Sequence, residues 1–160
     1  MNGIYLILAF VIGWFLAQGA KLITGFVQKK IKKEKFTWSD FSYYTFKSGG
    51  MPSGHTASFI ALSTEMFLLY GLNNPATILS FCTAAIFIYD AVNVRYAVGE
   101  HGKLLNEIAE SDNNPHTKPQ KIVEGHTIPQ VIVGAILGIA VAVAIFAIFG
   151  GDFAKIWPIL

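Results

Sequence analysis

Charged side chains are scarce in this chain of 160 residues: Asp, Glu, Lys and Arg make up 14%, against about 25% in soluble domains. Cysteine is almost absent, and because Cys82 stands alone it can form no disulfide within the chain. A net charge of +2 is too small to indicate nucleic-acid binding. Hydrophobic residues, by contrast, reach 53%, with a mean hydropathy of +0.50. This balance excludes a disordered chain, a disulfide scaffold and most soluble enzymes, and it indicates a polytopic membrane protein.

Four apolar segments predict helices that cross a bilayer. Ile128 to Gly151 is the clearest, with 24 residues and no charge, more than the roughly 20 residues that a span needs. Gly3 to Ala20 has no charge either, and without a signal-peptide pattern we expect it to be a retained span. The second and third segments flank the turn at residues 71–75 and form a hairpin. We therefore predict an all-α polytopic membrane domain over residues 1–160, a bundle of about four transmembrane helices, with spans near 3–22, 55–71, 76–94 and 128–150.

The basic residues predict the orientation of these spans. Ten of them lie in the connections 28–52 and 95–125, and one lies in the C-terminal tail. Because cytoplasmic loops carry the excess of Lys and Arg, we expect both connections to be cytoplasmic loops of a protein in the cell membrane. The cluster Lys29–Lys35 then needs no ligand, since an anchor at the membrane interface explains it.

With this topology, three polar segments reach the same membrane face: Met51–His55, Asp90–Arg95 and Gly125–Pro129. The first and third begin helices, whose unpaired N–H groups attract anions such as phosphate. Two histidines at such a site suit phosphoryl transfer through a covalent intermediate, because one imidazole can attack phosphorus while the other protonates the leaving alkoxide. Arg95 offers a planar fork for phosphate oxygens.

Each of these residues also has an ordinary explanation. A histidine at a membrane interface is more often an amphipathic filler than a catalyst. Arg95 alone can be a topology determinant, and Asp90 can simply pair with it. Glu65 lies about ten residues into the second span and should face the bundle interior or water. It is either a structural buried partner or a site residue.

These residues also carry a resemblance. Pro52-Ser53-Gly54-His55 and the segment 126–138 are similar to motifs of the type 2 phosphatidic-acid phosphatase superfamily of membrane lipid phosphatases. The whole chain more closely resembles the superfamily's divergent branch of short bacterial and plant proteins. The matching signatures, in order, are Ala17-Gln18-x-x-Lys21, Ser48-Gly-Gly-Met-Pro-Ser-Gly-His55, Tyr89-Asp90-Ala91-x-x-Val94-Arg95, Leu105-Asn106 and Gly125-His126-Thr127.

The resemblance implies a helical bundle that works without metal or cofactor, through a phosphohistidine intermediate. It makes His126 the expected nucleophile and His55 the general acid. The expected phosphate-binding residues are Ser53, Gly54, Lys21, Lys47 and Arg95.

The chain departs from the superfamily pattern in the last motif. Gln130 stands where an aspartate normally supports the nucleophile; it can accept a hydrogen bond from an imidazole but cannot balance an imidazolium charge. Asp90 or Glu124 could take over the carboxylate role. Arg95-x5-His101 also mimics an Arg-x5-His spacing, but Leu105 follows where an aspartate is expected, so His126 ranks above His101.

The sequence thus predicts a membrane lipid phosphatase that hydrolyses a phosphomonoester or pyrophosphate on a lipid at the cytoplasmic face. Gln130 favours an alternative: a catalytically weak or inactive protein that binds lipid phosphates or acts as a scaffold. Glu65 suggests a third class, a small transporter or flippase, although the repeated or broken spans of transporters are not evident. Four helices enclose a site thinly, which leaves room for a homodimer as the functional unit.

Overall fold

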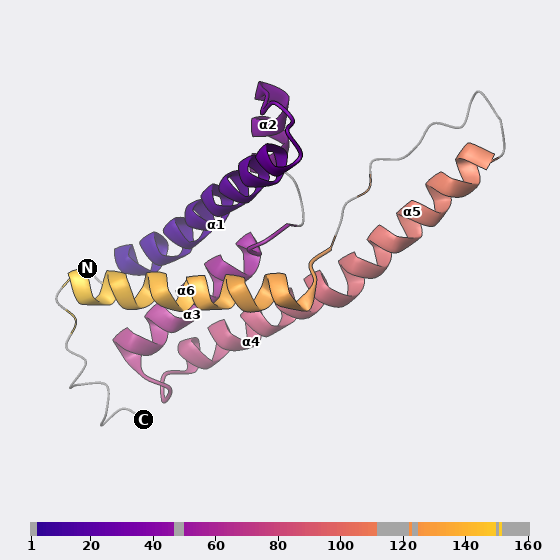
Figure 1. The fold of residues 1–160 in the computed structure, drawn as a ribbon. Coiled ribbons are helices and arrows are strands. Elements are labelled where there is room, and N and C mark those ends of the chain that lie inside the picture. Colours follow the sequence, from indigo (N-terminus) through magenta and orange to yellow (C-terminus); the bar gives the residue numbers. More distant parts are fainter. Residues whose placement is uncertain (1–2, 47–49, 112–121, 123–124, 150, 152–160) are drawn as a thin grey trace.

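The computed structural model describes residues 3–46, 50–111, 122, 125–149 and 151. Every regular element in these residues is a helix, so the predicted all-α class is confirmed (Figure 1). In chain order the elements are α1 (Gly3–Ile31), α2 (Trp38–Phe46), α3 (Gly54–Tyr70), α4 (Pro75–Tyr89), the π-helix η1 (Asp90–Val94), α5 (Arg95–Ser111) and α6 (Ile128–Ile148).

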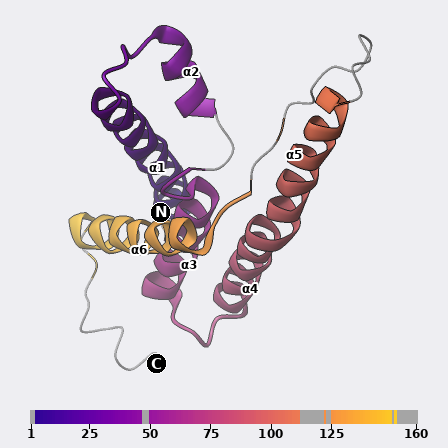
Figure 2. The ribbon, with the colours of Figure 1, turned by 45° about the vertical axis from the view of Figure 1, so that its right-hand side comes forward.

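Helix α3 lies at the centre of the bundle and packs against α1, α4 and α6 (Figures 1 and 2). Small residues make this possible. A Cβ at Gly13 of α1 would lie 3.0 Å from the carbonyl oxygen of Ala57, and one at Gly138 of α6 would lie 2.5 Å from the same atom. Helices in a membrane associate through such close approaches rather than through the hydrophobic effect.

Among the described residues, three helical stretches are long and apolar enough to cross a membrane: Gly3–Ile31, Pro75–Ser111 and Ile128–Ile148. The central helix α3, with 17 residues, is shorter than these. A membrane helical bundle is therefore the right description, while the expected number of four spans depends on α3.

The first helix is longer than the predicted span of residues 3–22, because it continues through the lysines of its last turn to Ile31. Lysine is a good helix former, so a change from apolar to basic residues does not end a helix. The helix stops just before Lys33, whose φ of 58° is left-handed. The segment expected to be a loop over residues 28–52 also contains the short helix α2.

The segment expected to be a second loop, 95–125, begins as the 17-residue helix α5, which continues α4 through η1. In η1 the N–H of Arg95 donates to the carbonyl oxygen of Asp90, the i→i+5 bond that defines a π-helix. The prediction of a loop was wrong here, because it rested on the polar composition of residues 95–111. These residues contain no proline, and their apolar side chains follow a helical period. α5 extends away from the rest of the bundle (Figures 1 and 2).

Candidate functional site

Backbone hydrogen bonds bring together the three polar segments at one end of the bundle. The N–H of Ser53, just before α3, donates to the carbonyl oxygen of Gln130 in α6 at 3.0 Å. The N–H of His126 donates to the carbonyl oxygen of Ala91 in η1 at 2.9 Å. The segments around His55, Asp90 and His126 therefore meet at this end of the bundle.

Two glycines allow these close approaches. A Cβ at Gly134 would lie 2.7 Å from the carbonyl oxygen of Ser53, so α6 can pass the start of α3 only with a glycine there. A Cβ at Gly125 would overlap the backbone of Arg95 and Tyr96 at the start of α5. Gly125 thus lets the chain cross α5 immediately before His126. The sequence did not predict this contact, and a glycine directly before the histidine is the signal that could have indicated it.

His126 is buried, with 5% of its surface exposed, immediately before the helix cap Thr127 of α6. Its Nδ1 lies 3.1 Å from the side-chain oxygen of Gln130, one helical turn further on. The same Gln130 oxygen accepts the backbone N–H of Thr127 at 3.1 Å. Because this atom acts as an acceptor, we assign the proton of His126 to Nδ1, which leaves the lone pair on Nε2.

The surroundings of His126 favour the neutral imidazole. Burial lowers its pKa most, and the positive charges of Lys21, His55 and Arg95 lower it further, while the hydrogen bond to Gln130 acts in the opposite direction. The charges of these three residues lie near enough to His126 to act on it. A neutral imidazole with a free Nε2 is the form that can attack phosphorus.

The start of α3 supplies backbone N–H groups. Ser53 is fully buried and caps the helix: its hydroxyl accepts the backbone N–H of Thr56 at 3.3 Å and the Thr56 hydroxyl at 2.9 Å. The N–H groups of Gly54 and His55 belong to the first turn, which has no preceding helical carbonyls to bond. The Ser53 hydroxyl is thus already used as a cap, a role that was not predicted for it from the sequence.

Two cations approach this site from different helices. Lys21 of α1 is buried, with 5% of its surface exposed, and its Cδ would lie 3.9 Å from a Cβ at Gly50. Arg95 donates from Nε to a carboxylate oxygen of Asp90 at 2.6 Å. The ion pair between Asp90 and Arg95 that the sequence suggested is therefore present.

Three further residues predicted for the site remain. His55 is exposed on the first turn of α3, and Lys47 and Glu124 lie outside the described residues.

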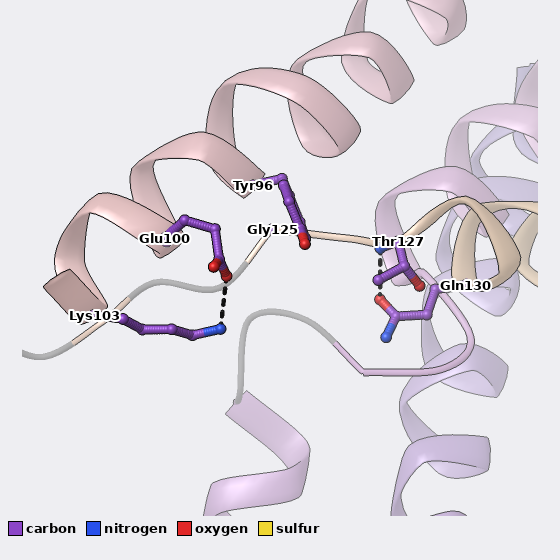
Figure 3. A pocket seen from close by; sticks show the side chains of 7 residues that line it. Tyr96, Glu100, Lys103, Gly125, Thr127 and Gln130 are labelled. Atoms are coloured by element: carbon purple, nitrogen blue, oxygen red, sulfur yellow. Dashed lines mark hydrogen bonds and ion pairs between the residues drawn. The ribbon is translucent and has the colours of Figure 1, made fainter.

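Two cavities lie on the α5 side of His126 and Gln130. One of about 260 Å³ is lined by Val92, Tyr96, His126, Thr127 and Ile128. The other, of about 170 Å³, contains the ion pair of Lys103 and Glu100, with 2.7 Å between Nζ and Oε1 (Figure 3). His126 thus lines the first cavity and Gln130 lines the second. His55 and Arg95 line neither cavity.

Two sequence candidates lie elsewhere. Glu65 is fully buried in the middle of α3, and neither carboxyl oxygen has a hydrogen-bond partner among the described residues. His101 is exposed on α5. Within the described ranges, no three His, Cys, Asp or Glu side chains gather closely enough to hold a metal ion.

Comparisons with known proteins identify the family of the chain. The model of the Divergent PAP2 family matches residues 2–141, a range that contains every motif of the site. The chain is 30% identical over 133 residues to the "Uncharacterized membrane protein YuiD" of Bacillus subtilis (strain 168), covering 74% of this chain and 82% of that relative. No solved structure matches the chain. From its first helix to most of its last, the chain belongs to the Divergent PAP2 family.

Proposed function

We propose that this protein is a metal-independent membrane phosphatase that hydrolyses a phosphomonoester or pyrophosphate on a lipid, with His126 as the nucleophile. The observation that carries the proposal is the His126–Gln130 contact. It holds a buried imidazole, with the proton assigned to Nδ1 and the lone pair to Nε2, beside the cations Lys21 and Arg95. Membership of the Divergent PAP2 family supports phosphate chemistry at these motifs.

The proposed reaction has two steps. Nε2 of His126 attacks phosphorus, the bond from phosphorus to the leaving oxygen breaks, and His55 donates a proton to that oxygen. A water molecule then attacks the phosphohistidine while His55 takes up its proton, and phosphate leaves. Lys21, Arg95 and the first N–H groups of α3 stabilise the negative charge on the phosphoryl oxygens.

Gln130 supports a second candidate function, a protein that binds lipid phosphates with little or no turnover. During the attack His126 becomes positively charged, and a neutral amide stabilises that charge less than a carboxylate does. The Asp90 carboxylate, which is the candidate for this role, pairs with Arg95 through one of its oxygens. The two candidates share the phosphate site and differ only in turnover.

Phosphate release separates the two candidates. The full chain in phospholipid vesicles is given phosphatidic acid, lysophosphatidic acid or a polyprenyl diphosphate in the presence of EDTA. Phosphate release that disappears in His126→Ala supports the enzyme, provided that it persists in His101→Ala. His101 serves as the control because it is a histidine on α5 outside the proposed site. No release from any lipid, with vanadate binding that depends on His126, supports the binding protein. Vanadate binding and release that are both independent of His126 overturn the proposed site.

We place the site on the cytoplasmic face of the cell membrane, because ten of the basic residues lie in the two connections on that side. Ser111→Cys at the end of α5, in a Cys82→Ser background, tests this. An impermeant maleimide should label the cysteine only after intact cells are opened. Ready labelling of intact cells would contradict the cytoplasmic position of the site.

A further inference from the structure

Asp90 and Arg95 stand at the two ends of the π-helix η1, and its wide turn brings their side chains together. On a regular α-helix, side chains five positions apart point about 140° away from each other, and the neighbours are three or four positions apart. In η1 the N–H of Arg95 bonds the carbonyl oxygen of Asp90, so the two residues lie one turn apart. Nε of Arg95 then donates to Oδ2 of Asp90 at 2.6 Å. The ion pair thus matches the π-helical turn rather than a regular helix.

The same turn also holds the segment of the proposed nucleophile. In a regular helix the N–H of Arg95 would bond the carbonyl oxygen of Ala91, four residues earlier. In η1 this N–H bonds Asp90 instead, and the Ala91 oxygen accepts the N–H of His126 at 2.9 Å. One helical turn therefore carries two contacts of the site, one to the backbone of His126 and one to the side chain of Arg95.

The bond to Asp90 determines which atoms of Arg95 stay available for a ligand. A guanidinium has five N–H donors in one plane, and the one on Nε is used by Asp90. Nη1 and Nη2 have no hydrogen-bond partner among the described residues, and 46% of the side chain is exposed. These two nitrogens form the fork that suits two oxygens of a phosphate. Arg95 is thus fixed at its inner nitrogen and open at its anion-binding end.

The ion pair lies close to both histidines of the site. The positive charge of Arg95 is near enough to act on His55 and on His126, and the negative charge of Asp90 acts on His55. By its charge alone, Asp90 would repel a phosphate bound between the two imidazoles. Its contribution to phosphate binding must therefore come through the orientation of Arg95.

We propose that Asp90 is a positioning residue for the phosphate site: its bond to Nε holds Arg95 so that Nη1 and Nη2 face the phosphoryl group. A free arginine side chain loses its rotamer freedom when it binds a ligand. A side chain that is already held loses less, and this pre-organisation increases affinity. The role rests on the phosphate site of the proposed function but not on turnover, because the enzyme and the binding protein share that site.

The sign of the change in vanadate affinity separates positioning from simple charge. Asp90→Ala removes a negative charge, so electrostatics alone would tighten vanadate binding by the purified full chain. Positioning predicts binding about tenfold weaker, measured by isothermal titration calorimetry. Asp90→Asn should fall between Asp90→Ala and the wild type, because its amide oxygen can still accept the Nε–H. Glu110→Gln, which removes the same charge from an exposed position of α5, is the matched control and should leave the affinity unchanged.

A double-mutant cycle tests whether Asp90 acts through Arg95. Arg95→Ala should itself weaken vanadate binding, and in that background Asp90→Ala should cause no further loss, because there is no guanidinium left to hold. Equal weakening by Asp90→Ala in both backgrounds would contradict the proposed role and favour a direct effect on His126.

Arg95→Lys provides a second measurement that leaves Asp90 in place. Lysine keeps the positive charge but has one nitrogen instead of a fork, so vanadate binding should again weaken about tenfold. Circular dichroism identifies the variants that retain their helices. Vanadate binding that depends on His126 but is unchanged or tighter in folded Asp90→Ala, or unchanged in folded Arg95→Lys, overturns the positioning role alone. Vanadate binding that does not depend on His126 overturns the proposed phosphate site instead.

Discussion

His126 owes its orientation to one backbone contact and one side-chain contact. Its backbone is bonded to η1 through Ala91, and its side chain contacts Gln130 within α6. Gln130 in turn is fixed by the N–H of Thr127. A neutral side chain in this place orients the imidazole without stabilising its positive charge, and this is the main difference between the site and one with a carboxylate.

Gln130→Asp should increase phosphate release by about tenfold or more, because a carboxylate would stabilise the imidazolium that forms during attack. A tenfold gain requires only about 1.4 kcal/mol of transition-state stabilisation. Vanadate affinity should change little, since the ground state carries less positive charge on His126. Turnover, vanadate affinity and thermal stability are measured together. A folded, vanadate-binding variant with unchanged turnover would count against His126 as the nucleophile.

The pH dependence of phosphoenzyme formation should report on His126. Its pKa is lowered from 6.5, mainly by burial. The native chain therefore holds this proton less tightly than the unfolded chain, so stability decreases as the pH falls through about 6.5. With an activated aryl phosphate, which needs no protonated leaving group, the rate should fall only below pH 6.5. Gln130→Asp should move this decline to higher pH, and an unchanged profile would exclude the contact as its cause.

The burial of the Glu65 carboxyl group reduces the stability of the folded chain. Its carboxyl oxygens are buried without a hydrogen-bond partner among the described residues, a situation that costs about 1–3 kcal/mol per group. Glu65→Leu should therefore raise the midpoint of thermal unfolding in detergent, while Glu65→Gln should leave it nearly unchanged. A lower midpoint for the leucine variant would indicate a partner that the described residues do not supply.

At the scale of the helices, close backbone contacts set the position of the site. The passage of α6 across α3 at Gly134 and Gly138 places Gln130 within reach of Ser53. Loss of this close contact should move the His126 segment relative to the start of α3.

Gly138→Leu should reduce stability by about 1–3 kcal/mol, because the added side chain meets the Ala57 carbonyl oxygen and must push the helices apart. Gly19→Ala is the matched control. A Cβ at Gly19 has no neighbour within 4 Å, so alanine in this helix interior should stabilise by about 0.5–1 kcal/mol. Thermal unfolding of both variants in detergent is the measurement. Equal destabilisation by both would contradict the packing account.

The existence of the apolar helices could be predicted from the sequence, because long uncharged runs such as 128–151 satisfy all their backbone hydrogen bonds within the segment as helices. Their ends could not. Lys29 and Lys30 continue α1, and Arg95 opens α5, because charge does not stop a helix. η1 was also not predictable, since π-helical turns are rare; within it, the Ala91 carbonyl oxygen accepts the N–H of His126, which lies far along the chain.

At the scale of the whole molecule, one end of the bundle collects the polar groups of α1, η1 and the starts of α3 and α6. The meeting of the three segments followed from topology alone, and the contact between His126 and Gln130 followed from their i+4 spacing. The ion pair between Asp90 and Arg95 was considered from their spacing in the sequence, and the structure contains it. The cavities beside α5 were not foreseen, because residues 95–111 were expected to be a loop rather than a helix that passes the site.

The central claim is that His126 carries the phosphoryl group, and trapping that intermediate tests it most directly. His55→Ala, given an activated aryl phosphate, should still form the intermediate but hydrolyse it slowly, because His55 no longer activates water. Mass spectrometry under alkaline conditions should then find an acid-labile phosphohistidine at position 126. The additional substitution His126→Ala should abolish it. Phosphate release by the wild-type chain, with no phosphate on His126 in the trapped variant, would contradict the account.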